Sequence, residues 1–185
     1  MIQCRRSFYF FLAFVGSAGS FSCTGSNNTA PTSGTQTSYF SLQDYFLREA
    51  DRLSRSAPKV DKTVSRNGAS ESKRVQIDDW KNELALFIDS DINKPAWQKS
   101  YRIDSTKHSL VYTCVDPELR TQKITIEKHE NGKVKHIAII NQSGNMLYQT
   151  AEQLNYYPDS LYQINKQQLV RFIGDSRYSI NGMLR

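Results

Sequence analysis

Long apolar runs are almost absent from this chain of 185 residues. The longest is FYFFLAFV, Phe8–Val15, which is too short to cross a bilayer as a helix of about 20 residues. Arg5 and Arg6 precede this run, and small residues follow it from Gly16 to Ser20. That order is typical of a secretory signal peptide, so we expect residues 1–22 to be cleaved. An uncleaved N-terminal membrane anchor is the alternative interpretation.

Cysteine is also scarce, with three residues in the chain. Cys4 would leave with the signal peptide and Cys23 lies directly after it, so Cys114 alone remains for the folded part. A single cysteine cannot form an internal disulfide, and the fold must therefore depend on its hydrophobic core. Cys114 follows Tyr112 in an alternating stretch, which favours a small buried residue over a reactive thiol.

The segment around Cys23 indicates a lipid anchor. Ser20-Phe21-Ser22-Cys23 resembles the lipobox of bacterial lipoproteins, in which the cysteine is lipid-modified, although Ser20 stands where leucine is usual. Residues 23–38 are polar and rich in Gly, Ser, Thr and Asn, a composition that behaves as a flexible linker. A tether between a lipid and a folded domain requires such a linker, so lipidation of Cys23 is favoured over plain secretion.

The charge balance argues against nucleic acid as a partner. The chain has 24 Lys and Arg against 18 Asp and Glu. Removal of Arg5 and Arg6 with the signal peptide leaves 22 basic residues against 18 acidic ones, a net charge of +4. These charges are scattered along the chain, whereas nucleic-acid binding requires a concentrated basic face.

Motifs of known enzymes are missing as well. The sequence contains no nucleophile elbow, no phosphate-binding glycine loop and no His-Glu-x-x-His spacing. We therefore predict a non-enzymatic protein that requires no cofactor.

Two helices are predicted in the first half of the mature chain. Ser41 and Asp44 have capping-box spacing, and Phe40 can pack on Tyr45, so a helix should begin after Ser41 and end near Ser56, before Pro58. Between the helices, Lys62–Ile77 reads as two short strands around Asn67-Gly68. A second helix should follow Asp78 or Asp79, with a buried stripe of Trp80, Leu84, Phe87 and Ile88.

From Tyr101 onward the pattern changes to short alternating runs separated by turn residues, which predicts an antiparallel meander. Ser143-Gly144-Asn145 and Gly174-Asp175-Ser176 are read as two of its connections. The clearest hairpin is Ile124–Ile140 around Asn131-Gly132, where a type I′ turn would pair Ile126 with Ile137 and Ile124 with Ile139. The predicted fold is α+β: residues 39–185 form a single domain of two N-terminal helices packed on a meander of about six to eight strands.

The same hairpin holds the candidate metal ligands. Its register places Glu127 opposite His136 and His129 diagonal to it, on the face away from the isoleucines. Two imidazoles and a carboxylate can bind zinc, but diagonal neighbours lie about 7–8 Å apart at the backbone. An exposed Glu–His pair without metal is the favoured interpretation, and a metal-dependent enzyme the unlikely alternative.

Three segments carry a resemblance to known proteins. Tyr39–Phe46 (YFSLQDYF), Phe87–Trp97 (FIDSDINKPAW) and Tyr157–Tyr162 (YPDSLY) resemble segments of uncharacterised envelope lipoproteins of Bacteroidetes. The resemblance extends from about Tyr39 to the C-terminus and implies a Gram-negative envelope. Residues 24–28 carry no acidic side chain, which on this resemblance favours an outer-membrane anchor that faces the periplasm.

Two functional hypotheses follow from these predictions. The first is a periplasm-facing lipoprotein that binds an apolar ligand between its helices and its sheet. The second is an accessory subunit that binds a partner protein in an envelope complex. A continuous apolar cavity would favour the first, and an exposed apolar patch would favour the second.

Overall fold

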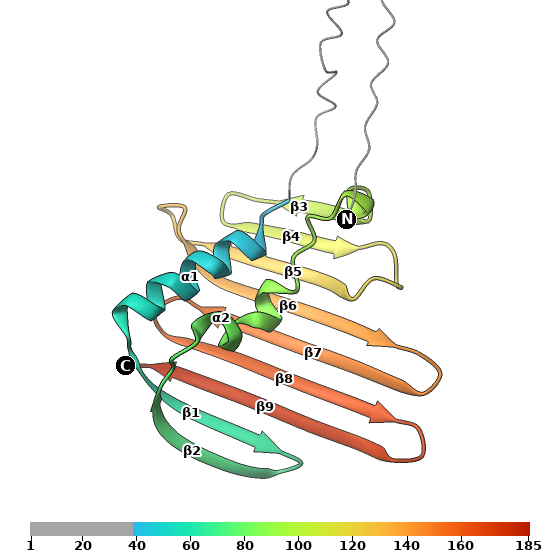
Figure 1. Ribbon diagram of the computed structural model, residues 1–185. Helices are drawn as coiled ribbons and strands as arrows, with labels where there is room; N and C mark the ends of the chain where they lie inside the picture. The colour runs from blue at the N-terminus through green and yellow to red at the C-terminus, as the bar shows by residue number, and fades with distance from the viewer. Residues whose placement is uncertain (1–38) are drawn as a thin grey trace, which may run out of the picture. The chain divides into compact units, whose positions relative to one another are not determined.

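The computed structural model describes residues 39–185, so the predictions for the signal peptide, Cys23 and the tether lie outside the described residues. The described chain forms one antiparallel sheet of nine strands with helices packed on one face (Figure 1). The strands are β1 (Lys59–Arg66), β2 (Ala69–Gln76), β3 (Tyr101–Ser105), β4 (Ser109–Cys114), β5 (Thr121–Lys128), β6 (Val134–Gly144), β7 (Tyr148–Tyr157), β8 (Leu161–Val170) and β9 (Gly174–Leu184). Their order across the sheet is β2-β1-β9-β8-β7-β6-β5-β4-β3. The predicted α+β class is confirmed, with nine strands in place of six to eight.

Helix α1 (Leu42–Ser56) follows the sequence prediction closely. The Ser41 hydroxyl accepts a hydrogen bond from the Asp44 N–H at 3.0 Å, which caps the first turn. The rings of Phe40 and Tyr45 pack with centroids 5.6 Å apart, as expected for a hydrophobic staple. The helix buries one stripe against the sheet, made of Leu42, Phe46, Ala50 and Leu53.

The predicted second helix is broken into two single turns, α2 (Trp80–Glu83) and α3 (Ala85–Ile88). Asp79 caps α2 as predicted, because its carboxylate accepts a hydrogen bond from the Asn82 N–H at 2.9 Å. A short 3-10 turn, η1 (Pro95–Trp97), follows α3. These turns come after the β1–β2 hairpin, so the prediction of two N-terminal helices is only partly correct.

The Ile124–Ile140 hairpin has the predicted isoleucine pairs, Ile126 with Ile137 and Ile124 with Ile139. The predicted type I′ turn is wrong. Among the residues of this turn only Gly132 has a positive φ, of 79°, and its N–H donates to the His129 carbonyl. A three-residue loop of this kind displaces the register by one residue at the tip, so Lys128 faces Val134 rather than Lys135.

Of two other predicted turns, one is confirmed and one is displaced along the chain. Asn67 and Gly68 have φ values of 49° and 90°, which is the type I′ geometry that Asn-Gly favours. Gly174-Asp175-Ser176 was read as a connection but belongs to β9, and the turn is made by residues 171–173. Phe172 within this turn and Gly174 directly after it both have positive φ, of 72° and 111°.

The β1–β2 hairpin is added to the sheet beside the C-terminal strand β9. Val60 is paired with Leu184, and the Arg185 N–H donates to the Lys59 carbonyl at 2.9 Å. The Asp61 carboxylate accepts hydrogen bonds from the guanidinium groups of Arg74 and Arg185, and these bonds lower its pKa to about 2. The first and the last strand of the described chain are therefore neighbours in the sheet.

The helices cover only part of one face of the sheet, called here the covered face (Figure 1). Buried residues of β6–β8 lie at one end of each strand, under α1 and α2; they are Ile137, Ile139, Leu154, Tyr156, Tyr162 and Ile164. The hairpin ends of β6–β9 extend beyond the helices (Figure 1). The opposite face, called here the bare face, has no second layer among residues 39–185.

Tyr162 and Gly182 form a close pair in the covered core. They lie opposite each other on β8 and β9, and the Tyr162 ring lies directly over the glycine. A Cβ atom at position 182 would overlap this ring, which is itself fully buried beside Trp80. The glycine is required here for space rather than for backbone freedom.

Replacement of this glycine tests that packing. We expect Gly182→Ala to lower the free energy of unfolding by about 2–3 kcal/mol, because the buried ring cannot move away without disturbing its neighbours. Urea denaturation followed by circular dichroism measures the loss. Gly68→Ala is the contrast, because a Cβ there meets no atom within 4 Å and only the backbone strain remains. Equal losses in the two variants would contradict the packing argument.

Candidate functional site

The predicted metal ligands do not converge. Glu127 and His136 are paired across β5 and β6 as predicted, with 3.9 Å between the Glu127 carboxylate and the His136 Nδ1. His129 lies exposed in the turn, where its backbone N–H donates to the Lys133 carbonyl. Among residues 39–185, no group of three His, Cys, Asp or Glu side chains is arranged to hold a metal ion. The geometry gives the metal-enzyme hypothesis no support.

His136 instead has a packing role on the bare face. Its ring stacks on Tyr157 with centroids 4.2 Å apart and an interplanar angle of 9°. Its Nε2 lies 3.0 Å from the Asn155 side-chain oxygen, within hydrogen-bond distance. The ring is therefore fixed by β7 rather than free to bind a ligand.

The layer between helices and sheet is filled by large side chains. Trp80, Phe46, Phe87, Tyr156 and Tyr162 are all fully buried there. The rings of Phe46, Phe87 and Tyr156 contact one another with centroids 4.8–6.0 Å apart. Such close aromatic packing gives the first hypothesis, an apolar ligand held in this layer, no support.

Two buried tyrosines attach the helices to the sheet through carboxylates. The Tyr156 hydroxyl of β7 donates to Glu49 of α1 at 2.6 Å, and the Tyr162 hydroxyl of β8 donates to Glu83 of α2 at 2.6 Å. Burial raises the pKa of both phenols, and the adjacent carboxylates raise it further. Both hydroxyls therefore stay protonated and act as donors.

Each of these carboxylates also pairs with a cation at the rim. Arg52 donates to Glu49 at 2.8 Å, and Lys62 lies 2.7 Å from Glu83. Burial alone would raise the pKa of Glu49, but the hydrogen bonds from Arg52 and Tyr156 outweigh it and lower the pKa below its usual value of 4.5. These two carboxylates are thus paired within the domain and are structural in character.

A third buried carboxylate, Glu152, lies on the covered face of β7. Its side chain is 5 % exposed and contacts Arg120 at 2.6 Å and Lys166 at 3.1 Å. The Asn141 amide donates to both Glu152 and the Ser90 hydroxyl. Arg120 also donates to the carbonyl of Asp89, beside the C-terminus of α3, so this cluster ties the helical turn to the sheet.

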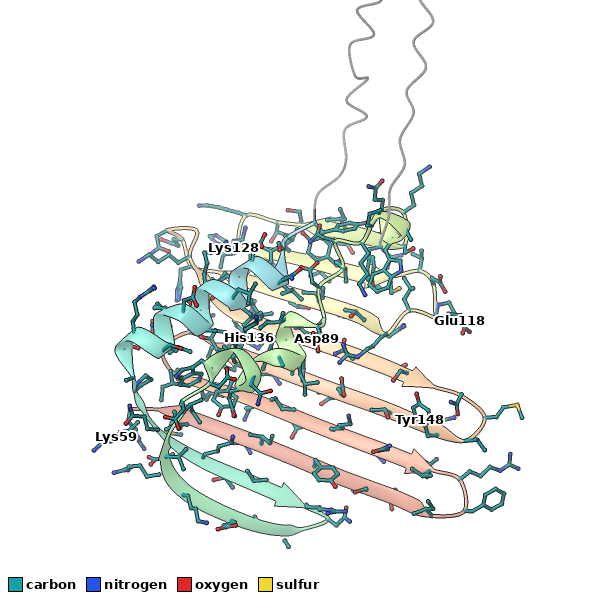
Figure 2. All side chains as sticks on the ribbon, viewed as in Figure 1. Lys59, Asp89, Glu118, Lys128, His136 and Tyr148 are labelled. Atoms are coloured by element: carbon teal, nitrogen blue, oxygen red, sulfur yellow. The ribbon has the colours of Figure 1, made fainter. Side chains whose placement is uncertain are left out.

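The most exposed large apolar residues gather at two adjacent hairpin ends. Met146 is 84 % exposed in the β6–β7 turn, and Phe172 and Ile173 are 92 % and 85 % exposed in the β8–β9 turn. The two turns are joined, because the Arg171 N–H donates to the Leu147 carbonyl at 2.8 Å. The hairpin-tip patch is defined as Met146, Leu147, Tyr148, Leu169, Phe172 and Ile173. Figure 2 shows Tyr148 at this end of β7, with Glu118 at the same end of the sheet.

Phe172 is unusual within the hairpin-tip patch. Its φ of 72° lies in the left-handed region, which costs a bulky residue about 1–2 kcal/mol relative to glycine. The strain brings no burial in return, since the ring is almost fully exposed and its contact within the domain is with the guanidinium of Arg171, 5.3 Å from the ring centroid. An exposed aromatic on a strained backbone is a feature of binding surfaces.

Two open depressions lie on the bare face, of about 690 and 420 Å³. The first lies beside the loop at Pro117 and Glu118, and both include Ala151 and Gln167. Amides and hydroxyls are the commonest side chains that line them, together with Glu118 and Leu169 in the first and Lys166 and Arg177 in the second. A purely apolar ligand would leave these polar groups without partners.

The hairpin-tip patch and the Glu152 cluster could not be predicted from the sequence as interpreted above. Adjacent apolar residues such as Phe172-Ile173 are a usable signal, but the alternation of Val170 with Phe172 predicts a strand at this position. Glu152 could not be recognised, because its partners Arg120 and Lys166 come from other strands or loops.

No protein-family model, curated protein or solved structure was found to match this chain. The resemblance to Bacteroidetes lipoproteins thus stays a prediction. Among the residues that the structure describes, no helix has the length and apolar character needed to span a membrane.

The Glu152 cluster predicts a pH-dependent contribution to stability. Burial acts to raise the pKa of Glu152. The positive charges of Arg120 and Lys166, and the hydrogen bonds that they donate, outweigh this effect and lower the pKa below 4.5. The stabilisation by Glu152 is therefore complete at pH values above the pKa that this carboxyl has in the unfolded chain. It is lost as the pH falls through the lower pKa of the folded chain.

We expect Glu152→Gln to lower the free energy of unfolding by about 1–3 kcal/mol near neutral pH, because two cations lose their shared partner. The difference from the unsubstituted chain should shrink as the pH is lowered from about 6 to about 3. Urea denaturation at several pH values measures both. Glu71→Gln, at an exposed ion pair on β2, is the control and should change stability little. A loss for Glu152→Gln that is independent of pH would contradict the assignment.

Proposed function

We propose that this chain is a non-enzymatic protein of the bacterial envelope, attached through lipid-modified Cys23 and facing the periplasm from the outer membrane. Its function is to bind a partner protein through the hairpin-tip patch. The observation that carries the proposal is the exposure of Phe172 and Ile173 on two hairpins that hydrogen bond to each other. This geometry favours the accessory-subunit hypothesis over the apolar-ligand hypothesis.

The composition of the hairpin-tip patch fits a protein partner. Tyr, Phe, Met and Arg are enriched at the centres of protein interfaces, and Tyr148, Phe172, Met146 and Arg171 occur together here. Binding to an anionic membrane surface would require a clear excess of positive charge. The nearby charges are instead of mixed sign, for example Asp175 beside Arg171.

The edges of the sheet are less suited to binding a partner. Edge strand β2 carries Glu71, Lys73 and Arg74, and edge strand β3 carries Arg102 and Asp104. Charged side chains on edge strands discourage the addition of a further strand. A partner is therefore expected at the end of the sheet rather than along its sides.

The tether is expected to join the domain on strands other than those that carry the hairpin-tip patch. Tyr39, the first described residue, is buried and packs edge-on against Tyr101 of β3 and Tyr112 of β4. The hairpin-tip patch belongs to β6–β9. The tether would thus join the domain at Tyr39, beside β3 and β4 rather than beside the strands that carry the hairpin-tip patch.

Substitutions in the hairpin-tip patch test the binding function. We expect Phe172→Gly with Ile173→Ser to reduce crosslinking of the full chain to its partner in native envelopes by about thirtyfold or more, as for two central interface residues. The free energy of unfolding should be unchanged or higher, because glycine relieves the positive φ at position 172. Quantitative crosslinking and urea denaturation give the two measurements.

Val115→Ser is the matched control, since Val115 is 61 % exposed in a different loop. It should leave the crosslinked product unchanged. Equal crosslinking by the hairpin-tip variant and the unsubstituted chain would rule out the hairpin-tip patch as the binding surface. Flotation of a Cys23→Ala chain with lipid vesicles, abolished by the same tip substitutions, would instead identify the hairpin-tip patch as a membrane contact.

Lipid attachment has its own test. We expect the Cys23→Ala chain, once residues 1–22 are removed, to move from the membrane fraction into the soluble periplasmic fraction, because no helix within residues 39–185 is long and apolar enough to anchor it. Fractionation followed by immunoblotting measures the distribution. Cys114→Ala is the control, because its half-buried thiol contacts the Asp116 carbonyl and has no part in anchoring. Membrane retention of the Cys23→Ala chain would refute the anchor.

A further inference from the structure

The bare face of β6, β7 and β8 carries no charged residue. Outward positions on these strands alternate with those of the covered core and hold no Asp, Glu, Lys or Arg. The flanking strands do carry charge on this face, with Lys123 and Glu127 on β5 and Asp175 and Arg177 on β9. Charged residues make up 23 % of the chain, so three adjacent strands without any on one face form a distinct surface.

Side-chain amides dominate this surface, which is called here the amide stripe. Within residues 39–185, the Asn155 side chain hydrogen bonds with His136, and the other amides of the stripe have no side-chain hydrogen bond. These free amides are Gln142, Gln149, Gln153, Gln163, Asn165 and Gln167. Each offers two N–H donors and one carbonyl acceptor to a ligand.

The amide stripe is also hollowed. The two depressions meet at Ala151 and Gln167, which line both of them. Gln142 and Gln149 line the first depression, and Gln153 lines the second. A ligand that crosses β6–β8 through both depressions would thus meet amides from three strands, with the small side chain of Ala151 allowing close approach.

The chemistry of this surface restricts its ligand. Anionic ligands such as nucleic acids or phosphates require free cations, and the amide stripe itself has none. The two cations at the wall of the second depression are already paired, Lys166 with Glu152 and Arg177 with Asp175. A purely apolar ligand would cover the amides without pairing them, at a cost in free energy for each. A chain of uncharged hydroxyl groups pairs with them as both donor and acceptor, and the apolar faces of its rings can contact Ala151 and Leu169.

We propose that the amide stripe binds an uncharged glycan chain. The proposal does not depend on the hairpin-tip patch, which lies at the strand ends and would bind a different kind of molecule. A domain with both surfaces would hold a partner protein next to a neutral polysaccharide.

The test is co-sedimentation of the full chain, in a mild non-ionic detergent, with insoluble neutral glycans. The probes are cellulose, chitin and an insoluble β-1,3-glucan, with cross-linked polygalacturonate as the acidic comparison. We expect saturable binding to at least one neutral glycan and no binding to the acidic one. Gln167→Glu should raise the dissociation constant for the glycan by about tenfold or more, and Gln153→Ala should raise it by about three- to tenfold.

Gln168→Glu is the matched control for Gln167→Glu. The two residues are adjacent on β8 and receive the same substitution, but Gln168 is on the covered side and lines neither depression. The Gln168→Glu chain should bind the glycan with a dissociation constant within about twofold of that of the unsubstituted chain. Circular dichroism should show that all variants are folded.

Three results would overturn the proposal. The first is the absence of binding to every neutral probe by the folded chain. The second is equal weakening by Gln167→Glu and Gln168→Glu. The third is concentration-dependent dimerisation that Gln167→Glu abolishes, in sedimentation velocity, without any glycan binding; the amide stripe would then be an interface between copies of the chain.

Discussion

The position of the helical layer depends on two buried tyrosines. The hydroxyls of Tyr156 and Tyr162 each donate to a carboxylate on a helix, Glu49 and Glu83, at 2.6 Å. Apolar burial supplies the larger part of the free energy, but it has no direction and would allow the helices to slide along the sheet. A slide that broke either hydrogen bond would leave a desolvated hydroxyl and a half-buried carboxylate without partners, which costs more than the bond itself contributes. The polar contacts therefore decide where the apolar core forms, and hence which half of the sheet is left uncovered.

Charged, amide and apolar side chains also occupy separate regions of the surface. Charged residues lie on the edge strands β2 and β3 and on the strands that flank the amide stripe, where they keep the domain soluble and discourage strand addition. Amides lie between them on the bare face of β6–β8, and apolar side chains lie at the hairpin ends. The proposed functions use these amide and apolar surfaces. A solvated sheet face has no structural need for so many amides, and an exposed Phe172 with a positive φ has no structural benefit.

Local features of the fold could be predicted from the sequence, and long-range features could not. The Ser41 cap, the Phe40–Tyr45 contact and the apolar stripe specify α1 within fifteen neighbouring residues, and the isoleucine spacing specifies the β5–β6 pairing. The pairing of Glu127 with His136 was predicted for the same reason, whereas the position of His129 depended on a turn type that Asn131-Gly132 suggested wrongly. The contact between β1 and β9 joins residues more than a hundred positions apart, such as Val60 and Leu184, and no local pattern records it. The partial cover by the helices was equally hidden. On the covered face β7 continues from Leu154 to Glu152 and β8 from Ile164 to Lys166, and no local pattern shows where the helices end.

The uncovered ends of β6–β9 also have consequences for motion. There, both faces of the sheet contact solvent, so the strands are held by backbone hydrogen bonds and cross-strand contacts without the burial that stabilises Leu154 or Ile164. Stretches with few buried apolar contacts open at lower free energy than the core to which they are attached. The hairpin ends can thus separate and close while the helix-covered half stays folded, and backbone amides near Tyr148 and Val170 should exchange with solvent through such openings rather than through global unfolding. The domain thus combines a stable helix-covered half with hairpin ends that open more easily, and both proposed binding surfaces extend over these hairpin ends.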